Sequence, residues 1–203
     1  MEAIPLTNYP PPQAPTRRKL LLRIALVAAL PTLAPAAPAA ANSVTWVALQ
    51  SGDIVLFRHA NAPGVGDPAG FVLGDCRTQR NLDAVGRTQA QLIGQRFAEL
   101  NIPVGSVISS QWCRTVDTAQ LAFPGRGQGN PVFNSFFDTG DSAASQTAAA
   151  RALLLEWTGP GVLVVFTHQV NITALTQTVP SSAEGVVLRK TGNTLQVMGR
   201  VQP

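Results

Sequence analysis

The chain has only two histidines, and each one follows a run of apolar residues; no other feature of the sequence constrains the fold as strongly. Residues 54–57 precede Arg58 and His59, and residues 162–166 precede Thr167 and His168. Short continuous apolar runs are typical of strands buried on both faces of a parallel sheet. Because ligand sites in open α/β sheets lie at the carboxyl ends of strands, we expect both imidazoles at one site.

Apolar strands alternate with amphipathic helices along the rest of the chain. The pattern predicts strands at 53–58, 105–109, 161–167, 184–190 and 194–201, and helices at 84–100, 113–122, 144–157 and 169–177. In the first helix, Ala84, Val85, Leu92, Phe97 and Leu100 are expected to share the core face. We therefore predict an α/β fold, a three-layer sandwich with a mostly parallel central sheet and helices on both faces. The last two strands predict an edge hairpin.

Two stretches rich in glycine and proline, 60–75 and 123–143, interrupt this pattern. The first follows His59 directly. Long loops at the carboxyl ends of strands commonly carry binding and catalytic residues. We therefore expect these loops to surround the site.

Residues 1–41 have the pattern of an export signal peptide, which leaves 42–203 as the mature domain. The basic residues Arg17, Arg18 and Lys19 precede an apolar stretch at 20–30, and a cleavage signal of small residues ends at Ala41. The arginine pair also resembles a twin-arginine signal, so both this route and the Sec route stay open. An uncleaved anchor is the alternative, but the apolar stretch is shorter than the roughly 20 residues of a spanning helix. We expect a periplasmic or secreted protein without stable membrane insertion after processing.

The positive charge of the chain lies mostly in this leader. The full chain has a net charge of +4, whereas the part after residue 41 has 11 basic and 10 acidic residues. No basic run remains that would indicate nucleic-acid binding.

The two cysteines, Cys76 and Cys113, are expected to form one disulfide in an exported protein. Zinc would need further cysteine or histidine ligands nearby, so no metal site is predicted.

Arg114 lies in the first turn of the predicted helix 113–122, directly after a strand that ends in serines. A positive side chain is unfavourable at a helix N-terminus, whereas the free N–H groups there favour an anion. A bound phosphate would relieve this conflict.

Four motifs in order resemble the histidine phosphatase superfamily, in its phosphoglycerate mutase-like branch. They are Arg58-His59, Asn81-Leu82-x-x-x-Gly86-x-x-Gln89-Ala90, Ser110-x-x-x-Arg114-Thr115-x-x-Thr118-Ala119, and Thr167-His168. The resemblance implies that His59 is a nucleophile that becomes phosphorylated. It also implies that Arg58, Arg114 and His168 hold the phosphoryl oxygens, a role that His168 fills best when protonated, and that no cofactor is needed. Covalent catalysis and directional arginine donors suit phosphoryl transfer.

The chain departs from the family pattern in two places. Ala60 replaces the glycine that usually follows the histidine, which matters if that position needs a positive φ. The glutamate that often serves as general acid is absent, and Gln169 stands where the acid-phosphatase branch has aspartate. Asp138, which two phenylalanines are expected to desolvate, is the first candidate for the acid, and Asp141 is the second.

Two roles stay open for Arg80: it contacts the substrate, or it is a cation that only serves the loop.

The sequence thus predicts an exported, metal-independent phosphomonoesterase of the histidine acid phosphatase type, acting on a small phosphomonoester. Cell-envelope phosphosugars suit the compartment. The alternative is a phosphate-binding or envelope-interaction protein of the same fold with weak or no turnover, which Ala60 and the unsettled acid would explain.

Overall fold

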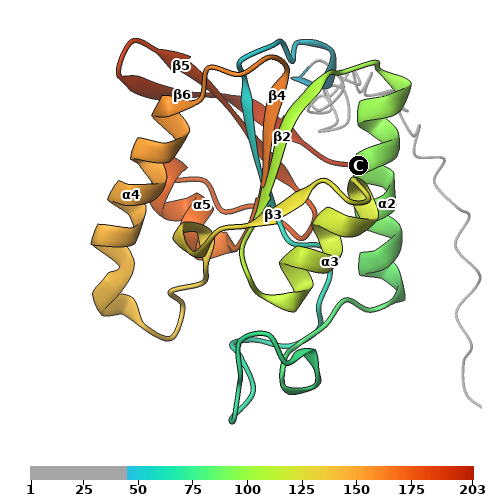
Figure 1. Ribbon diagram of the computed structural model, residues 1–203, viewed down its shortest axis with the longest axis vertical. Helices are drawn as coiled ribbons and strands as arrows, with labels where there is room; N and C mark the ends of the chain where they lie inside the picture. Colours follow the sequence, from blue (N-terminus) through green and yellow to red (C-terminus); the bar gives the residue numbers. More distant parts are fainter. Residues whose placement is uncertain (1–44) are drawn as a thin grey trace, which may run out of the picture. The chain divides into compact units, whose positions relative to one another are not determined.

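The computed structural model describes residues 45–203, so the predicted signal peptide at 1–41 lies outside the described residues. The elements follow the chain in the order β1 (Ile54–Arg58), η1 (Cys76–Thr78), α2 (Ala84–Glu99), β2 (Val104–Ser109), α3 (Cys113–Ala122), β3 (Gly127–Gly129), η2 (Pro131–Phe133), η3 (Gly140–Ser142), α4 (Ala143–Glu156), β4 (Val162–Thr167), α5 (Gln169–Thr176), β5 (Gly185–Thr191) and β6 (Thr194–Val201). Here the η elements are short 3₁₀ helices. The α/β fold class predicted from the sequence is confirmed, and Figure 1 shows the arrangement.

The strands form one mixed sheet in the order β3-β2-β4-β1-β5-β6. β1 to β4 run parallel to their neighbours among themselves, whereas β5 pairs antiparallel with β1 and with β6. The centre is therefore parallel, and the predicted edge hairpin is present. In the register of β1 and β4, Arg58 lies opposite Thr167, so the residues that follow these two strands emerge side by side.

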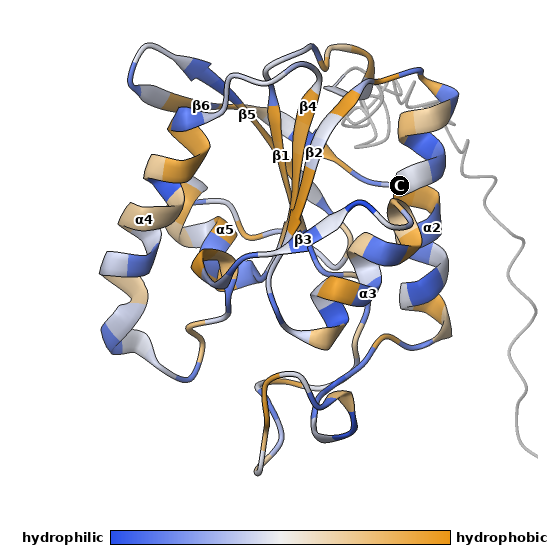
Figure 2. Cartoon of the chain, in the orientation of Figure 1, coloured by the Kyte–Doolittle hydropathy of each residue, from blue (hydrophilic) through white to orange (hydrophobic). Residues whose placement is uncertain are grey.

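Helices cover both faces of the sheet: α2 and α3 lie on one side, α4 and α5 on the other (Figure 1). Because successive side chains of a strand point to opposite faces of the sheet, each face has its own hydrophobic core. In β1, Val55 and Phe57 join the cluster with α2 and α3, whereas Ile54 and Leu56 join the cluster with α4 and α5. The central strands are the most apolar part of the chain in Figure 2, as strands buried on both faces require.

The buried face of α2 differs from the prediction. The structure buries Gly86, Ala90, Ile93 and Phe97, which recur at spacings of four, three and four. Of the residues expected there, only Phe97 is buried, and Val85, Leu92 and Leu100 are exposed. The close approach of Gly86 to the loop decides this, because a Cβ on Gly86 would lie 2.1 Å from the carbonyl oxygen of Asn61. Packing therefore selects the face that begins with the two small residues Gly86 and Ala90.

Within 123–143, predicted as irregular, the structure adds β3 and two short 3₁₀ helices. β3 consists of Gly-Gln-Gly and has no apolar side chain, so its strand conformation comes from pairing with β2 rather than from its own residues. No helix within residues 45–203 has the length and apolar character needed to span a membrane.

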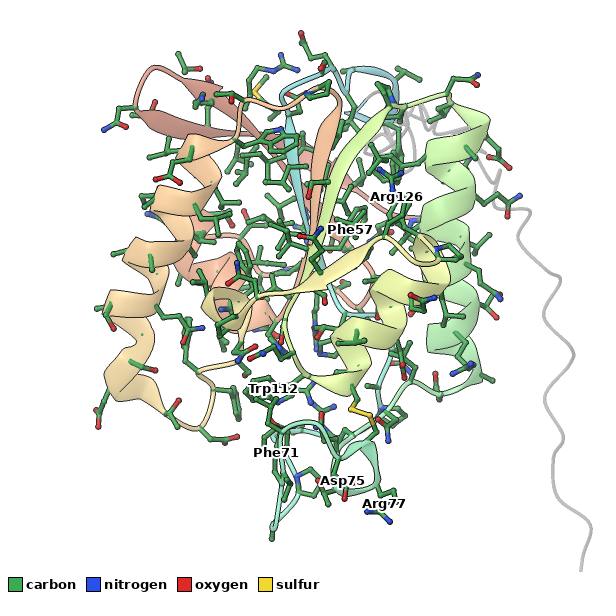
Figure 3. All side chains as sticks on the ribbon, viewed as in Figure 1. Phe57, Phe71, Asp75, Arg77, Trp112 and Arg126 are labelled. Atoms are coloured by element: carbon green, nitrogen blue, oxygen red, sulfur yellow. A yellow bond between two sulfur atoms is a disulfide. The ribbon has the colours of Figure 1, made fainter. Side chains whose placement is uncertain are left out.

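The disulfide expected from the sequence joins Cys76 to Cys113 across 37 residues, with 5.6 Å between the Cα atoms. It connects η1, in the long loop after β1, to the first residue of α3 (Figure 3). The loop is thus covalently tied beside Arg114.

Candidate active site

The two histidines meet at the carboxyl ends of the adjacent strands β1 and β4. The backbone N–H of His59 donates to the carbonyl oxygen of Thr167 at 2.9 Å, which continues the strand pairing by one residue. The ring centroids of His59 and His168 are 5.6 Å apart, and both residues are at most 4% exposed. The pairing of β1 with β4 therefore brings the two histidines together, as expected from the sequence.

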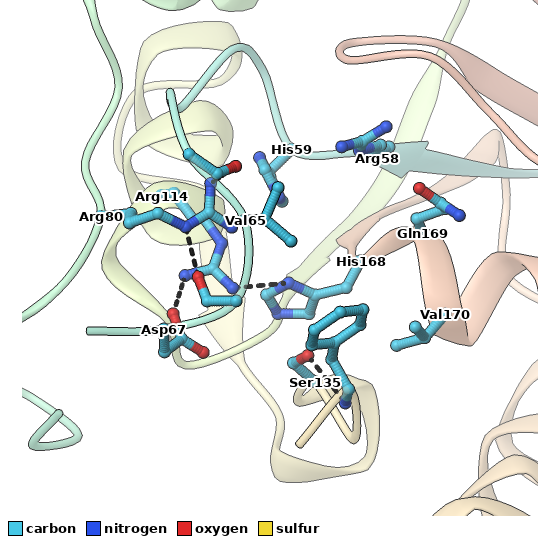
Figure 4. Close-up of a pocket in the computed structure, with 13 residues that line it drawn as sticks. Arg58, His59, Val65, Asp67, Arg80, Arg114, Ser135, His168, Gln169 and Val170 are labelled. Atoms are coloured by element: carbon cyan, nitrogen blue, oxygen red, sulfur yellow. Dashed lines mark hydrogen bonds and ion pairs between the residues drawn. The ribbon is translucent and has the colours of Figure 1, made fainter. Parts of the chain in front are cut away.

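A pocket of about 160 Å³ opens at this edge of the sheet (Figure 4). Five residues with a guanidinium or an imidazole group, all predicted as site candidates from the sequence, line the pocket: Arg58, His59, Arg80, Arg114 and His168. Asp67 is the carboxylate among the lining residues. The candidate acids Asp138 and Asp141 are not among them.

His59 is a neutral imidazole whose tautomer is fixed by the backbone. Its Nδ1 lies 2.8 Å from the carbonyl oxygen of Ala60, which can only accept, so Nδ1 carries the hydrogen. Nε2 is left with its lone pair. Burial lowers the pKa of His59 to about 3, and the charges of Arg114 and Arg58 add to this, while the contact with Ala60 opposes it. At neutral pH, Nε2 is therefore available as a nucleophile.

Arg58 and Arg114 are each anchored through Nη1. Nη1 of Arg58 donates to the carbonyl oxygen of Pro180 at 3.1 Å, and Nη1 of Arg114 donates to Asp67 at 2.6 Å. In both, Nε is buried and has no hydrogen-bond partner within residues 45–203. A buried charged donor without a partner is costly, so both groups are suited to an anion in the pocket.

Asp67 is the site residue that the sequence reasoning missed. Its Oδ1 accepts from Arg114, and its Oδ2 accepts from Trp112 Nε1 at 2.8 Å. Burial alone would raise the pKa of Asp67, but hydrogen bonds from Arg114 and Trp112 outweigh it and lower the pKa. The sequence signal was weak, because Asp67 is one polar residue in a Gly/Pro loop, 47 positions from Arg114.

His168 is neutral as well. Nη2 of Arg114 lies 3.4 Å from its Nδ1, which therefore accepts, and Nε2 donates to Ser110 Oγ at 2.8 Å. Burial lowers the pKa of His168 well below its ordinary value, and the neighbouring His59 and Arg114 add to the shift. A positive charge on this ring would need a bound anion to offset the arginines.

Arg80 lines the pocket and also holds the loop. Its Nη1 donates to the carbonyl oxygens of Ala62 and, at 2.9 Å, of Gly64, and its Nε donates to that of Gly66. The role as a loop cation is thus observed. Because Arg80 also lines the pocket, its contact with the substrate stays a proposal.

The N-terminus of α3 differs from the expected backbone anion site. The N–H of Cys113 donates to Gln79 Oε1 at 2.9 Å, and the N–H of Trp112 donates to Ser110 Oγ at 3.2 Å. These donors are already used. The guanidinium groups of Arg58, Arg80 and Arg114 supply positive charge to the pocket.

Ala60 fits its position without strain. The non-glycine residues with positive φ in residues 45–203 are Asn101, Gln177 and Ala183, so Ala60 has an ordinary φ. Its methyl group is fully buried in the core beside α2 and α3, and its N–H donates to Thr118 Oγ1 at 3.1 Å. The missing glycine therefore removes no required conformation.

The expected desolvation of Asp138 is not observed. Asp138 is exposed, and so is the neighbouring Phe137. Asp138 still lies at the rim of the pocket, since a Cβ on Gly66 would be 3.8 Å from its Oδ1. Asp141 is exposed in η3.

No group of three or more histidine, cysteine or carboxylate side chains that could hold a metal ion comes together within residues 45–203. Chemically, the pocket combines a neutral imidazole nucleophile with three guanidinium groups. This combination suits a tetrahedral oxyanion.

Comparison with known proteins agrees with the fold and the motifs. Residues 54–133 match the model of the histidine phosphatase superfamily, branch 1, and this stretch contains Arg58, His59 and Arg114. We found no curated protein with significant sequence similarity to the chain.

Solved structures share the fold at low identity. A phosphoserine phosphatase from Entamoeba histolytica in complex with phosphoserine has 16% identity and a TM-score of 0.53, with 73% of this chain and 95% of that chain covered. The alpha-ribazole phosphatase from Shigella flexneri has 13% identity and a TM-score of 0.53, with 72% and 95% covered. The protein histidine phosphatase SixA complexed with tungstate has 14% identity and a TM-score of 0.50, with 74% and 97% covered. At these identities the likeness establishes the fold.

Proposed function

We propose that the chain is a metal-independent phosphomonoesterase of the histidine phosphatase superfamily, branch 1, a proposal supported by the match of residues 54–133 to that family and by the shared fold. The reaction proceeds through a phosphohistidine intermediate on His59. The oxyanions and phosphomonoesters bound by structures of the same fold, tungstate and phosphoserine, agree with this class of ligand.

One observation carries the proposal: the guanidinium groups of Arg58 and Arg114 each leave a buried Nε unpaired next to the neutral nucleophile His59. Burying charged donors without partners is unfavourable unless a ligand completes them. A phosphoryl group offers acceptor oxygens to both side chains and is attacked by a neutral imidazole. The arginines supply the positive charge that phosphoryl transfer requires.

In the first step, the lone pair of His59 Nε2 attacks phosphorus and the P–O bond to the organic group breaks. The proton that remains on His59 stays at Nδ1, hydrogen-bonded to Ala60. The leaving oxygen takes a proton from Asp138, which lies at the rim beside Gly66. In the second step, water attacks the phosphohistidine, Asp138 recovers the proton, and phosphate and free His59 are formed.

Asp67 is not suited to donate this proton, because its pKa is lowered and it stays ionised. Asp67 instead forms an ion pair with Arg114. Asp141 remains the second candidate for the acid.

Export is the further part of the proposal. It is supported by the signal-like residues 1–41 and by the disulfide Cys76–Cys113, because disulfides persist in oxidising compartments. Small phosphomonoesters of the cell envelope, including phosphosugars, are the substrates that this location would offer.

The alternative is a protein that binds phosphate in this pocket without turning substrates over. The exposure of Asp138 favours it, because an exposed carboxylate at the rim is a weak general acid.

The test is hydrolysis of p-nitrophenyl phosphate and of an alkyl phosphate by the purified protein, with and without EDTA, compared with His59→Ala. We expect turnover that resists EDTA, is lost in His59→Ala, and leaves an acid-labile phosphoenzyme when the reaction is quenched in alkali. Phosphate binding without turnover of either ester would instead support the alternative. Loss of activity on chelation would contradict the metal-independent mechanism.

A further inference from the structure

The entrance of the pocket is apolar, although its floor is strongly charged. Val65 comes from the loop after β1, Phe137 from the loop before η3, and Val170 from the first turn of α5. All three line the pocket, and Val65 and Val170 are labelled in Figure 4. Here they are called the apolar entrance.

Two of these side chains are unusually exposed. Val65 is 87% exposed and Phe137 is 55% exposed. The two loops meet here, because a Cβ on Gly66 would lie 3.8 Å from Cε1 of Phe137. The phenyl ring therefore leans on the neighbouring loop at the pocket opening and keeps the rest of its surface open to solvent.

The floor and the entrance would contact different parts of one ligand. Arg114, His59 and His168 are at most 4% exposed and hold the phosphoryl group, in the function proposed above. An ester bound there must place its organic group toward the opening, because the leaving group lies opposite the attacking His59 Nε2. The organic group therefore meets Val65, Phe137 and Val170.

Few uncharged polar side chains line the pocket. Ser135 Oγ already accepts from the backbone N–H of Phe137 at 3.3 Å, and Gln169 is the other uncharged polar side chain that lines the pocket. Sugar hydroxyls bound against valine and phenylalanine would lose water without gaining partners. An alkyl or aryl group would instead cover exposed apolar surface.

We propose that the natural substrate is a phosphomonoester with an apolar organic group, and that Val65 and Phe137 are the residues that determine this specificity. The inference rests on the proposed phosphatase function. It favours an alkyl or aryl phosphate over the phosphosugars of the envelope.

The experiment compares n-hexyl phosphate with glucose 6-phosphate, because both release a primary alcohol and differ mainly in polarity. We expect kcat/KM to be at least about tenfold higher for hexyl phosphate, a difference within the range that a few apolar contacts provide. The double variant Val65→Ser and Phe137→Ser should reduce this ratio about tenfold, mainly through KM. Its inhibition by inorganic phosphate, which does not reach the apolar entrance, should stay unchanged.

Val72→Ser is the matched control. Val72 lies on the same loop as Val65 and is 53% exposed, but it does not line the pocket. This variant should keep the wild-type preference for hexyl phosphate.

Equilibrium binding of both esters to His59→Ala keeps the test independent of turnover. Tighter binding of hexyl phosphate than of glucose 6-phosphate, abolished by the double variant, would support the inference. This holds even if the wild-type protein hydrolyses neither ester, because a lack of hydrolysis would overturn only the phosphatase proposal. Equal or tighter binding of glucose 6-phosphate would overturn the inference while the phosphatase proposal stands. A ratio that the double variant leaves unchanged would exclude Val65 and Phe137 as the specificity residues.

Discussion

The carboxylate of Asp67 holds the guanidinium of Arg114 in a buried ion pair, with 2.6 Å between Oδ1 and Nη1 and side chains that are 10% and 3% exposed. A guanidinium has two edges that can bind an oxyanion in a bidentate manner. Asp67 occupies Nη1, Nη2 reaches His168, and Nε has no partner within residues 45–203. Asp67 is therefore a positioning residue for the proposed phosphate-binding arginine.

Replacing Asp67 by asparagine should lower kcat about tenfold or more, because a misplacement of about 1 Å in a positioning group can cost about a hundredfold in rate. Inhibition by inorganic phosphate should change much less. The lost anchor weakens phosphate binding, whereas the lost negative charge strengthens it. Steady-state kinetics with p-nitrophenyl phosphate and phosphate as inhibitor separate the two effects.

Asp75→Asn is the control for this change, since Asp75 pairs with Arg77 on the same loop in an exposed ion pair. Exposed pairs contribute little, so its kinetics should match the wild type. An unchanged kcat in Asp67→Asn would show that Arg114 needs no anchor.

Asp138→Asn should reduce activity on alkyl phosphates more than on p-nitrophenyl phosphate. An alkoxide needs a proton as it leaves, whereas p-nitrophenolate is a stable anion. The ratio of kcat values for the two esters measures this difference, with Asp141→Asn as the parallel variant. Equal losses on both esters would remove Asp138 as the general acid, and a selective loss in Asp141→Asn would transfer the role.

The free energy of unfolding should fall as pH decreases from about 6.5 toward about 3. The pKa of His59 is about 3 in the folded protein and 6.5 ordinarily, so within this window the unfolded chain binds the proton that folded His59 does not. The pKa of His168 is lowered in the same direction. The stabilisation is thus fully present above pH 6.5 and is lost on acidification.

Urea unfolding at pH 7.5 and pH 4.5 measures the effect, and His59→Gln should lose less stability between these two pH values than the wild type. The same loss in both proteins would mean that His59 is not held neutral by its surroundings.

Removing the disulfide should destabilise the protein and disturb the pocket together. For a separation of 37 residues, the chain-entropy model gives about 4 kcal/mol. The variant Cys76→Ser with Cys113→Ser should therefore unfold at lower urea concentration, and KM should rise because the loop with Asp67 and Arg80 is no longer tied to α3. Reduction of the wild-type protein should reproduce both changes. Two free thiols in the denatured, unreduced protein would show that the bond does not form.

Ala60→Gly should not increase activity, although it restores the residue usual in the family. Ala60 already has an ordinary φ, so glycine offers no conformation that the site lacks. Its buried methyl group contributes packing, and its loss should cost about 1 kcal/mol in the free energy of unfolding. A clear rise in kcat would show that the methyl group hinders the reaction.

Local sequence patterns were sufficient for the two histidines and for every strand except β3, which has no apolar side chain. The apolar runs that become β1 and β4 are read from adjacent residues, and parallel pairing then places His59 and His168 at one edge. Arg114, which follows the serine-ended strand β2, was found in the same way. The core face of α2 was not, because Val85 and Leu92 have helical spacing but Gly86 and Ala90 allow the closer approach to the loop and the sheet.

The sequence by itself therefore determined the α/β fold class, the order of the elements, the nucleophile candidate and the arginines that accompany it. These depend on patterns within a few residues of one another. Only the tertiary structure decided that Asp67 orients Arg114, that both imidazoles are neutral, and that the entrance is apolar while Asp138 stays exposed. Each of these depends on contacts between loops and strands far apart in the chain, and on the burial that such contacts create.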